Sequence, residues 1–132
     1  MVLDTSAIAA IFLREPEGEE FTSAIEADPR RLISAATLVE CSLVLEGRAA
    51  DAGGRELDLF LHRTQTGVVS VDAEQAEAAR SAWRRFGRGR HSAALNFGDC
   101  FSYALAQVSG EPLLFKGADF ARTDVVPALS SS

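Results

Sequence analysis

Short apolar segments alternate with longer amphipathic segments along this chain, and that alternation restricts the possible folds most. The segments that predict strands cover residues 2–4, 31–36, 67–71, 112–116 and 124–127. Each is short and mostly apolar, which is typical of parallel strands that are buried on both faces. Strands that alternate with helices indicate an α/β fold. We therefore expect a short central parallel sheet of four to five strands with helices on both faces.

Helical spacing and capping residues predict the helices between these strands. The predicted helices begin near Ser6, Pro16, Thr37, Arg55, Asp72 and Asp99, and a short helix or turn covers 117–123. Thr5 or Ser6 is expected to cap the first helix, Thr37 the helix after the second strand and Asp72 the helix after the third, because a side-chain oxygen at such a position accepts a backbone hydrogen bond. Residues 50–54 predict a turn and residues 87–98 a loop.

Length and composition set further limits. The 132 residues favour one domain, 1–132, with 127–132 as a frayed tail, and the 47% hydrophobic content suffices for a core without disulfides. We see neither a signal peptide nor an apolar run near the roughly 20 residues that span a bilayer. Cys41 and Cys100 lack CxxC spacing, so we expect buried thiols and a cytoplasmic protein without membrane contact.

Four carboxylates stand where acids are costly, three of them at strand ends or helix starts and the fourth inside an apolar helix. Asp4 ends the first predicted strand, Asp99 begins a helix, and Asp119 follows residues 112–116. Glu40 lies in the helix after the second strand. The topology brings all four to the carboxyl edge of a parallel sheet, where ligands bind in such folds. Oxygen ligands without His or Cys favour Mg²⁺ or Mn²⁺. Each acid alone also has a structural interpretation, as a cap, a surface residue or a turn residue.

Several sequence motifs resemble those of PIN domains, and more narrowly the VapC toxins of bacterial VapBC toxin–antitoxin pairs. The motifs are "VLDTSA", "ATLVECSLVLEGR", "LNFGDCFSYALA" and "PLLFKGADFARTDV", and the resemblance covers residues 2 to about 126. It implies a metal-dependent ribonuclease toxin, often a homodimer, that a cognate VapB-type antitoxin neutralises.

The resemblance also assigns roles to individual residues. The acids of the family fall on Asp4, Glu40 and Asp99, and the more variable fourth acid falls best on Asp119, with Asp124 as a competitor. Asp4 and Asp99 would hold Mg²⁺ or Mn²⁺, with Glu40 direct or through water and Asp119 more weakly. The family's small hydroxyl falls on Thr5 or Ser6. Such a site would hydrolyse RNA phosphodiesters with a metal-activated water.

Arginines offer a means of attracting RNA to this acidic chain, whose net charge is −6. The candidates for phosphate contacts are Arg80, Arg84, Arg85, Arg88 and Arg90. Arg80, Arg84 and Arg88 are four residues apart, so they would follow one helix face toward the loop. A solvated helix face without any RNA contact explains the same spacing.

Other functions compete with this interpretation. A catalytically inactive PIN-like domain would act only by binding a partner, although all three main acids are present. Phosphatases that form an aspartyl-phosphate need a second Asp two residues after the first, where this chain has Ser6. Receiver domains carry paired acids at the first strand, which this chain lacks. A nucleophilic cysteine at position 41 or 100 would need a nearby histidine, and neither His62 nor His91 has an evident place there.

Overall fold

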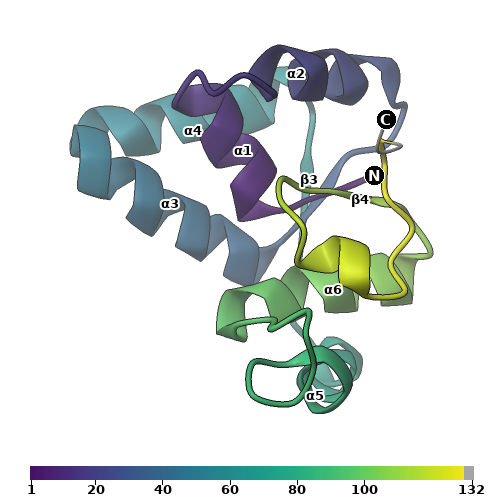
Figure 1. Ribbon diagram of the computed structural model, residues 1–132. Coiled ribbons are helices and arrows are strands. Elements are labelled where there is room, and N and C mark those ends of the chain that lie inside the picture. Colours follow the sequence, from purple (N-terminus) through teal and green to yellow (C-terminus); the bar gives the residue numbers. More distant parts are fainter. Residues whose placement is uncertain (130–132) are drawn as a thin grey trace.

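Four short parallel strands form one sheet in the order β3–β2–β1–β4 in the computed structural model, which describes residues 1–129 (Figure 1). The strands are β1 (Val2–Leu3), β2 (Leu32–Ser34), β3 (Gly67–Val69) and β4 (Leu113–Leu114). Val2 pairs with Leu32 on one side and Leu113 on the other. Since β1 is central, the residue that follows it lies in the middle of the sheet's carboxyl edge.

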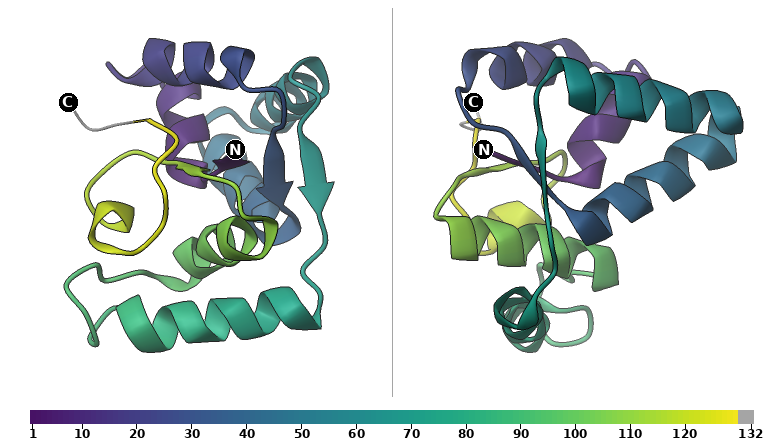
Figure 2. Two further views of the ribbon diagram at one scale, coloured as in Figure 1. Left: turned by 90° about the vertical axis from the view of Figure 1, so that its right-hand side faces the viewer. Right: turned by 180° about the vertical axis from the view of Figure 1, so that it is seen from behind.

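Helices cover both faces of this sheet (Figures 1 and 2). They are α1 (Thr5–Phe12), α2 (Gly18–Ala27), α3 (Ala35–Ala49), α4 (Asp51–Arg63), α5 (Ala73–Phe86) and α6 (Phe97–Ser109), followed by the 3-10 helix η1 (Phe120–Arg122). The helices α1 to α4 pack on one face, and α5 and α6 pack on the other. The predicted α/β architecture with a parallel sheet is thereby confirmed.

Alternating side chains of the strands divide the core into two clusters. Leu3 and Leu114 pack with α1 to α4, whereas Val2 and Leu113 pack with α5 and α6. Successive side chains of a strand point to opposite faces, so even two-residue strands contribute to both clusters. No helix between residues 1 and 129 is both long and apolar enough to cross a membrane.

The first two strands, β1 and β2, are shorter than predicted because helices begin directly after them. Asp4 caps α1 and Ser34 caps α3, each accepting a hydrogen bond from a backbone N–H two residues later. The predicted caps at Thr5 or Ser6 and at Thr37 were therefore wrong, whereas the cap at Asp72 is confirmed. Residues 124–127 contribute only an isolated bridge between Leu113 and Pro127, not a fifth strand.

One predicted break in the chain is helical, and another ends two residues earlier than expected. The expected turn at 50–54 is largely the start of α4, with only Ala50 in a left-handed conformation. A Cβ at position 53 would collide with the carbonyl of Leu45 in α3. The lack of a side chain at Gly53 therefore lets α4 approach α3 closely. The loop predicted at 87–98 is confirmed through Asn96, and α6 begins at Phe97 and not at Asp99, because Asn96 supplies its cap.

The C-terminal end was predicted to be frayed from residue 127 onward. Pro127 instead bridges to Leu113, and Ala128 donates a backbone hydrogen bond of 2.8 Å to the Leu113 carbonyl. Leu129 packs against the core cluster of α1 to α4. The remainder of the predicted tail, 130–132, lies outside the described residues.

Candidate active site

Asp4 lies at the centre of the sheet's carboxyl edge and is 2% exposed. Its Oδ2 accepts hydrogen bonds from the Ser6 backbone N–H at 3.0 Å and from the Ser6 hydroxyl at 2.7 Å. The Ser6 hydroxyl oxygen in turn accepts a 2.9 Å bond from the backbone N–H of Lys116, just after β4. Asp4 is therefore both a helix cap and a carboxylate held at the point where ligands of α/β sheets bind.

Glu40 reaches the same edge from the second turn of α3. Its Oε1 accepts a 2.5 Å hydrogen bond from the Thr5 hydroxyl, which joins α3 to the start of α1. Its carboxylate also lies against Gly98 in the first turn of α6, where any Cβ would collide with it. Gly98 thus allows the second acid to lie beside the third, Asp99.

Asp99 occupies the first turn of α6 in a reciprocal capping box. Its Oδ2 accepts a 3.0 Å bond from the Asn96 backbone N–H, and its own N–H donates 2.9 Å to the Asn96 side chain. Burial raises the pKa of the Asp99 carboxyl to about 6, although the bond from Asn96 acts in the opposite direction. The negative charges of Asp4, Glu40 and Asp119 raise it further. These four acids therefore share one electrostatic environment.

The two candidates for the fourth acid have different surroundings. Asp119 is exposed just before η1, and its charge raises the pKa of Asp99. Asp124 accepts a 2.6 Å bond from the Tyr103 hydroxyl and a 3.0 Å bond from Arg85. Burial opposes its ionisation, but these hydrogen bonds lower the pKa of Asp124. The structure brings Asp119 toward the other acids and engages Asp124 elsewhere.

The donors at this edge suit a hard divalent cation. They are carboxylates and hydroxyls, which Mg²⁺ and Mn²⁺ prefer. Within residues 1–129, no three side chains of His, Cys, Asp or Glu converge closely enough to hold an ion as they stand. Glu40 is bonded to Thr5 and Asp99 to Asn96, and either carboxylate can leave these partners by side-chain rotation. The chemistry of the donors and the charge repulsion at Asp99 therefore fit a cation that draws the acids inward.

Two buried hydroxyls belong to this site that sequence reasoning did not include. The Ser102 hydroxyl donates a 2.6 Å hydrogen bond to Asp4 Oδ1, and Thr37 lies 3.2 Å from Ser102. A signal for both was present, because Ser102 comes three residues after Asp99 and Thr37 three residues before Glu40. Residues at that spacing share one side of a helix.

The arginines expected to contact phosphate have different neighbours, although Arg80 and Arg84 line the same groove between α5 and α6. Arg80 pairs with Glu77 at 2.5 Å, Arg85 pairs with Asp124, and Arg90 stacks on Trp83 at 4.2 Å. Arg84 lines a groove of about 530 Å³ between α5 and α6. Arg88 lies beyond the C-cap Gly87, so it does not continue the helix face of Arg80 and Arg84.

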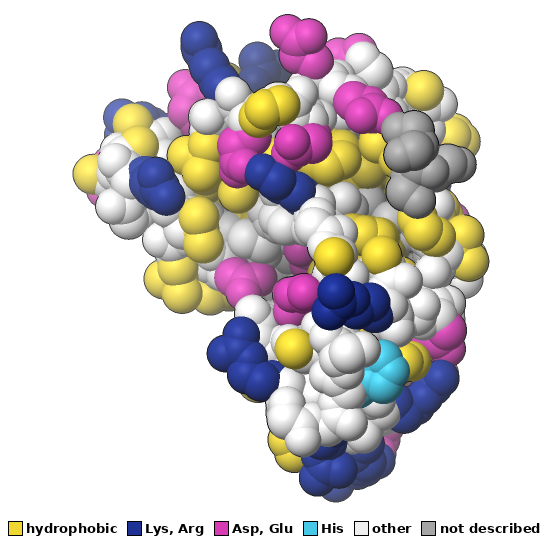
Figure 3. All heavy atoms as spheres, viewed as in Figure 1, with side chains coloured by type: hydrophobic (Ala, Val, Ile, Leu, Met, Phe, Trp, Pro, Cys, Tyr) yellow, Lys and Arg dark blue, Asp and Glu magenta, His cyan; other side chains and the backbone are white. Residues whose placement is uncertain are grey.

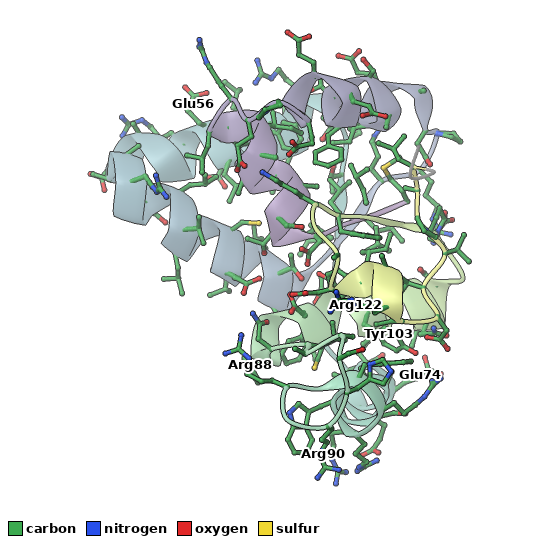
Figure 4. All side chains as sticks on the ribbon, in the orientation of Figure 1. Glu56, Glu74, Arg88, Arg90, Tyr103 and Arg122 are labelled. Atoms are coloured by element: carbon green, nitrogen blue, oxygen red, sulfur yellow. The ribbon has the colours of Figure 1, made fainter. Side chains whose placement is uncertain are left out.

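Basic side chains nevertheless lie beside the acids. Figure 3 shows acidic side chains near the middle of one face, with basic side chains on two sides of them. In the same orientation, Figure 4 labels Arg88 and Arg122 at these positions. Arg122 belongs to η1 and donates a 3.0 Å bond to the Ser92 carbonyl. Sequence reasoning missed Arg122, although it comes only three residues after Asp119.

Neither cysteine has the properties of a nucleophile. Burial raises the pKa of Cys41 to about 12 and that of Cys100 to about 11. Both are free and buried, as the sequence predicted. A thiol that remains protonated at neutral pH is a weak nucleophile, so these residues fill space beneath the acids.

Comparison with known proteins agrees with this geometry. The family model of the PIN domain matches residues 1–126. Ribonuclease VapC30 of Mycobacterium tuberculosis is 57% identical over 125 residues, which cover 95% of each chain. The chain therefore belongs to the PIN-domain family, within its VapC group.

Solved structures share the fold at low sequence identity. VapC20 of Mycobacterium tuberculosis, described as a toxin that cleaves the sarcin-ricin loop, has a TM-score of 0.77 at 20% identity and 95% coverage of both chains. A toxin–antitoxin complex from Klebsiella pneumoniae has a TM-score of 0.72 at 20% identity and 98% coverage of both chains. At this identity, the similarity supports the fold and leaves the activity to be argued from the site.

Proposed function

We propose that this protein is an Mg²⁺- or Mn²⁺-dependent endoribonuclease, the toxin of a type II toxin–antitoxin pair, acting on cytoplasmic RNA. The observation that carries the proposal is the raised pKa of Asp99, about 6, at the sheet's carboxyl edge, which burial causes first and the charges of Asp4 and Glu40 increase. Such an arrangement is unfavourable without a cation. Relatives named ribonuclease VapC, at 57% identity, support the same conclusion.

In this proposal Asp4 and Asp99 hold the cation, with Glu40 direct or through water and Asp119 more weakly. A bound Mg²⁺ or Mn²⁺ supplies a Lewis acid that lowers the pKa of a water and neutralises charge on phosphate oxygens. The Asp4 carboxylate is oriented by Ser6, and the Glu40 carboxylate is oriented by Thr5. The chain therefore positions two of the acids through hydroxyls on the first turn of α1.

The substrate is inferred to be an RNA strand whose phosphates are attracted by arginines near the acids. Arg88 and Arg122 are placed for this role (Figure 4). The roles predicted for Arg80, Arg85 and Arg90 are less well supported, because each already has a partner within the chain. Attack by water, in place of the RNA 2′-hydroxyl, leaves 5′-phosphate and 3′-hydroxyl ends.

The decisive experiment measures cleavage of total RNA by purified protein. We expect chelation of divalent ions to abolish cleavage and Mg²⁺ or Mn²⁺ to restore it. Sequencing of the product ends should find 5′-phosphates. Full activity in excess chelator would overturn the metal mechanism, and 2′,3′-cyclic phosphate ends would overturn the water nucleophile.

An exposed apolar surface supports the proposed homodimer. Phe97 is 81% exposed and Leu43 is 71% exposed, and Val39 is also exposed one turn before Leu43. Val39 and Leu43 lie on α3, which contacts the start of α6 through Glu40 and Gly98, and Phe97 lines the adjoining groove between α5 and α6. Large apolar side chains grouped on a surface mark interaction sites. We assign this surface to a second copy of the chain.

Light scattering of the wild type and of Leu43→Asp tests the dimer. The wild type should have twice the monomer mass and the variant the monomer mass, with both proteins folded. A monomeric wild type would remove the homodimer and leave this surface to the VapB-type antitoxin. Co-purification with the protein encoded beside the toxin, followed by loss of RNA cleavage, tests the antitoxin itself.

The alternative functions have less support. An inactive binding domain does not require three carboxylates at one sheet edge. An aspartyl-phosphatase or a receiver domain needs a second acid close to Asp4, but Ser6 occupies that position and bonds to Asp4 instead.

A further inference from the structure

We propose that Ser102, supported by Thr37, is a positioning residue that fixes the Asp4 carboxylate within the acid site. This inference rests on the function proposed above, since it assigns a purpose to hydroxyls beneath the proposed metal ligands. Both hydroxyls lie within the quoted sequence motifs, but the resemblance assigns neither of them a role in the site.

The direction of the hydrogen bonds follows from the number of protons. The Ser102 hydroxyl lies 2.6 Å from Asp4 Oδ1, and an ionised carboxylate can only accept, so Ser102 donates. A serine has a single hydroxyl proton, so Ser102 must accept in its other bond. The Thr37 hydroxyl, 3.2 Å away, therefore donates to Ser102. The result is one directed chain from Thr37 through Ser102 to Asp4.

Burial makes this chain difficult to replace. Ser102 is 0% exposed and Thr37 is 1% exposed. Water does not reach the pair, so loss of one hydroxyl leaves its partner without a hydrogen bond. The two bonds from Ser6 hold only the Oδ2 atom of Asp4. The bond from Ser102 holds the other oxygen, and both together prevent the carboxylate from rotating.

The chain also joins the three elements that carry the main acids. Ser102 is on α6 with Asp99, and Thr37 is on α3 with Glu40. Asp4 lies between β1 and α1. A hydrogen bond from Ser102 to Asp4 therefore sets the position of the first acid relative to the helix of the third. Groups that orient metal ligands in this way typically change metal affinity by about 10- to 100-fold when removed.

The test measures Mn²⁺ binding by titration calorimetry without RNA. We expect Ser102→Ala to bind Mn²⁺ about 10-fold more weakly than the wild type. Thr37→Val, which keeps the shape and removes the hydroxyl, should weaken binding by a smaller factor. Because Thr37 acts only through Ser102, the double variant should bind no more weakly than Ser102→Ala alone. Wild-type affinity in Ser102→Ala, or multiplicative losses in the double variant, would overturn the inference.

Thr64→Val is the matched control for Thr37→Val. The Thr64 hydroxyl donates a hydrogen bond to the Phe60 carbonyl at the end of α4, away from the acids. This variant should retain wild-type Mn²⁺ affinity even where its melting temperature falls. If Ser102→Ala does not fold, Ser102→Cys keeps the size with a weaker donor and should show an intermediate loss; wild-type affinity there would overturn the inference.

The outcomes separate this inference from the proposed function. Protein that binds Mn²⁺ through Ser102 but cleaves no RNA would refute the ribonuclease and preserve the positioning role. RNA cleavage by the wild type, together with unchanged Mn²⁺ affinity in Ser102→Ala, would refute the positioning role and preserve the ribonuclease. A wild type that binds no Mn²⁺ would overturn both.

Discussion

Helix α6 carries two acidic clusters that differ in how their charge is balanced. At its first turn, Asp99 lies among other carboxylates, and its pKa is raised to about 6, first by burial. One turn further, Tyr103 bonds to Asp124, which also bonds to Arg85. There the pKa of Asp124 is lowered in spite of burial. We call these the Asp99 cluster and the Asp124 cluster.

The difference shows how a functional acid can be distinguished from a structural one. The Asp124 cluster contains its own cation and donors, so its charges are balanced within the fold. The Asp99 cluster has like charges, and its hydrogen bonds do not offset them fully. A cation from solution would complete the balance, so the Asp99 cluster is the one that we assign to catalysis.

Replacing each acid by its amide should give the largest contrast. Asp99→Asn should reduce RNA cleavage by roughly 10²–10³-fold, the usual cost of losing one charge-stabilising group. Asp124→Asn should leave cleavage unchanged. Initial rates on one RNA substrate at saturating Mn²⁺ measure both. A defect in Asp124→Asn as large as that in Asp99→Asn would remove the distinction between the clusters.

The fourth acid should give a smaller contrast. Asp119→Ala should reduce turnover about 10-fold or require more Mn²⁺, as expected for a group at the edge of a metal site. Asp124→Ala should retain turnover but lose about 1 kcal/mol of stability, because it leaves Tyr103 and the partly exposed Arg85 without their acceptor. Cleavage across a Mn²⁺ titration, with urea unfolding of both variants, decides which aspartate is the fourth acid.

Stability should depend on pH through Asp99 in the metal-free protein. Its pKa rises from 3.8 to about 6 on folding, so the folded state holds the proton more tightly than the unfolded state. Stability is therefore highest below pH 4 for this group and falls as pH rises toward 6. We expect Asp99→Asn to remove this decrease and to be more stable than the wild type at pH 8 by roughly 1–2 kcal/mol, after allowance for screening. Urea unfolding at pH 5 and pH 8 with chelator tests it.

Asp4 is the control within the same cluster. The Asp4 carboxylate accepts three hydrogen bonds, from the Ser6 N–H and from the hydroxyls of Ser6 and Ser102. The NH₂ group of an asparagine at this position would face at least one of these donors. Asp4→Asn should therefore lose stability by about 1–3 kcal/mol while also losing activity. A gain in stability there would contradict the bonds from Ser6 and Ser102.

The sequence predicted the fold well because the apolar pattern of each strand has one explanation. Runs such as residues 31–36 suit a buried parallel strand, and the alternation with helices determines the rest. Residues 67–69 form β3 at the edge of the sheet and are largely exposed, contrary to the prediction of a buried strand. Boundaries were less predictable, since capping depends on which of several adjacent polar residues reaches a backbone N–H. Thr37 is an example: it was expected to cap α3 but is buried below Asp4, and Ser34 caps the helix instead.

The candidate site was predictable for the acids and not for the residues that support them. Asp4 and Asp99 follow from topology, because strand ends and helix starts meet at one edge. Ser102 and Thr37 bond across 65 residues of sequence. Their helical spacing from Asp99 and Glu40 is a local signal, but it does not show that the two hydroxyls meet each other or bond to Asp4. The RNA contacts of the arginines stay a prediction, because helical spacing cannot show which of them pair with acids of the same chain, as Arg80 does with Glu77 and Arg85 with Asp124.

The smallest expected effect compares arginines beside the two clusters. Arg88 and Arg122 lie near the acids (Figure 4), whereas Arg85 is paired with Asp124. An arginine that binds a phosphate releases counterions, so its removal makes the dependence of log affinity on log salt shallower by about 0.7 for single-stranded RNA. Arg88→Ala and Arg122→Ala should each change the slope by up to this amount, and Arg85→Ala should not. Fluorescence anisotropy of an uncleaved RNA in Ca²⁺ or chelator, from low to moderate salt, measures the slopes. A change only in Arg85→Ala would place the RNA beside the Asp124 cluster and reverse the assignment of the two clusters.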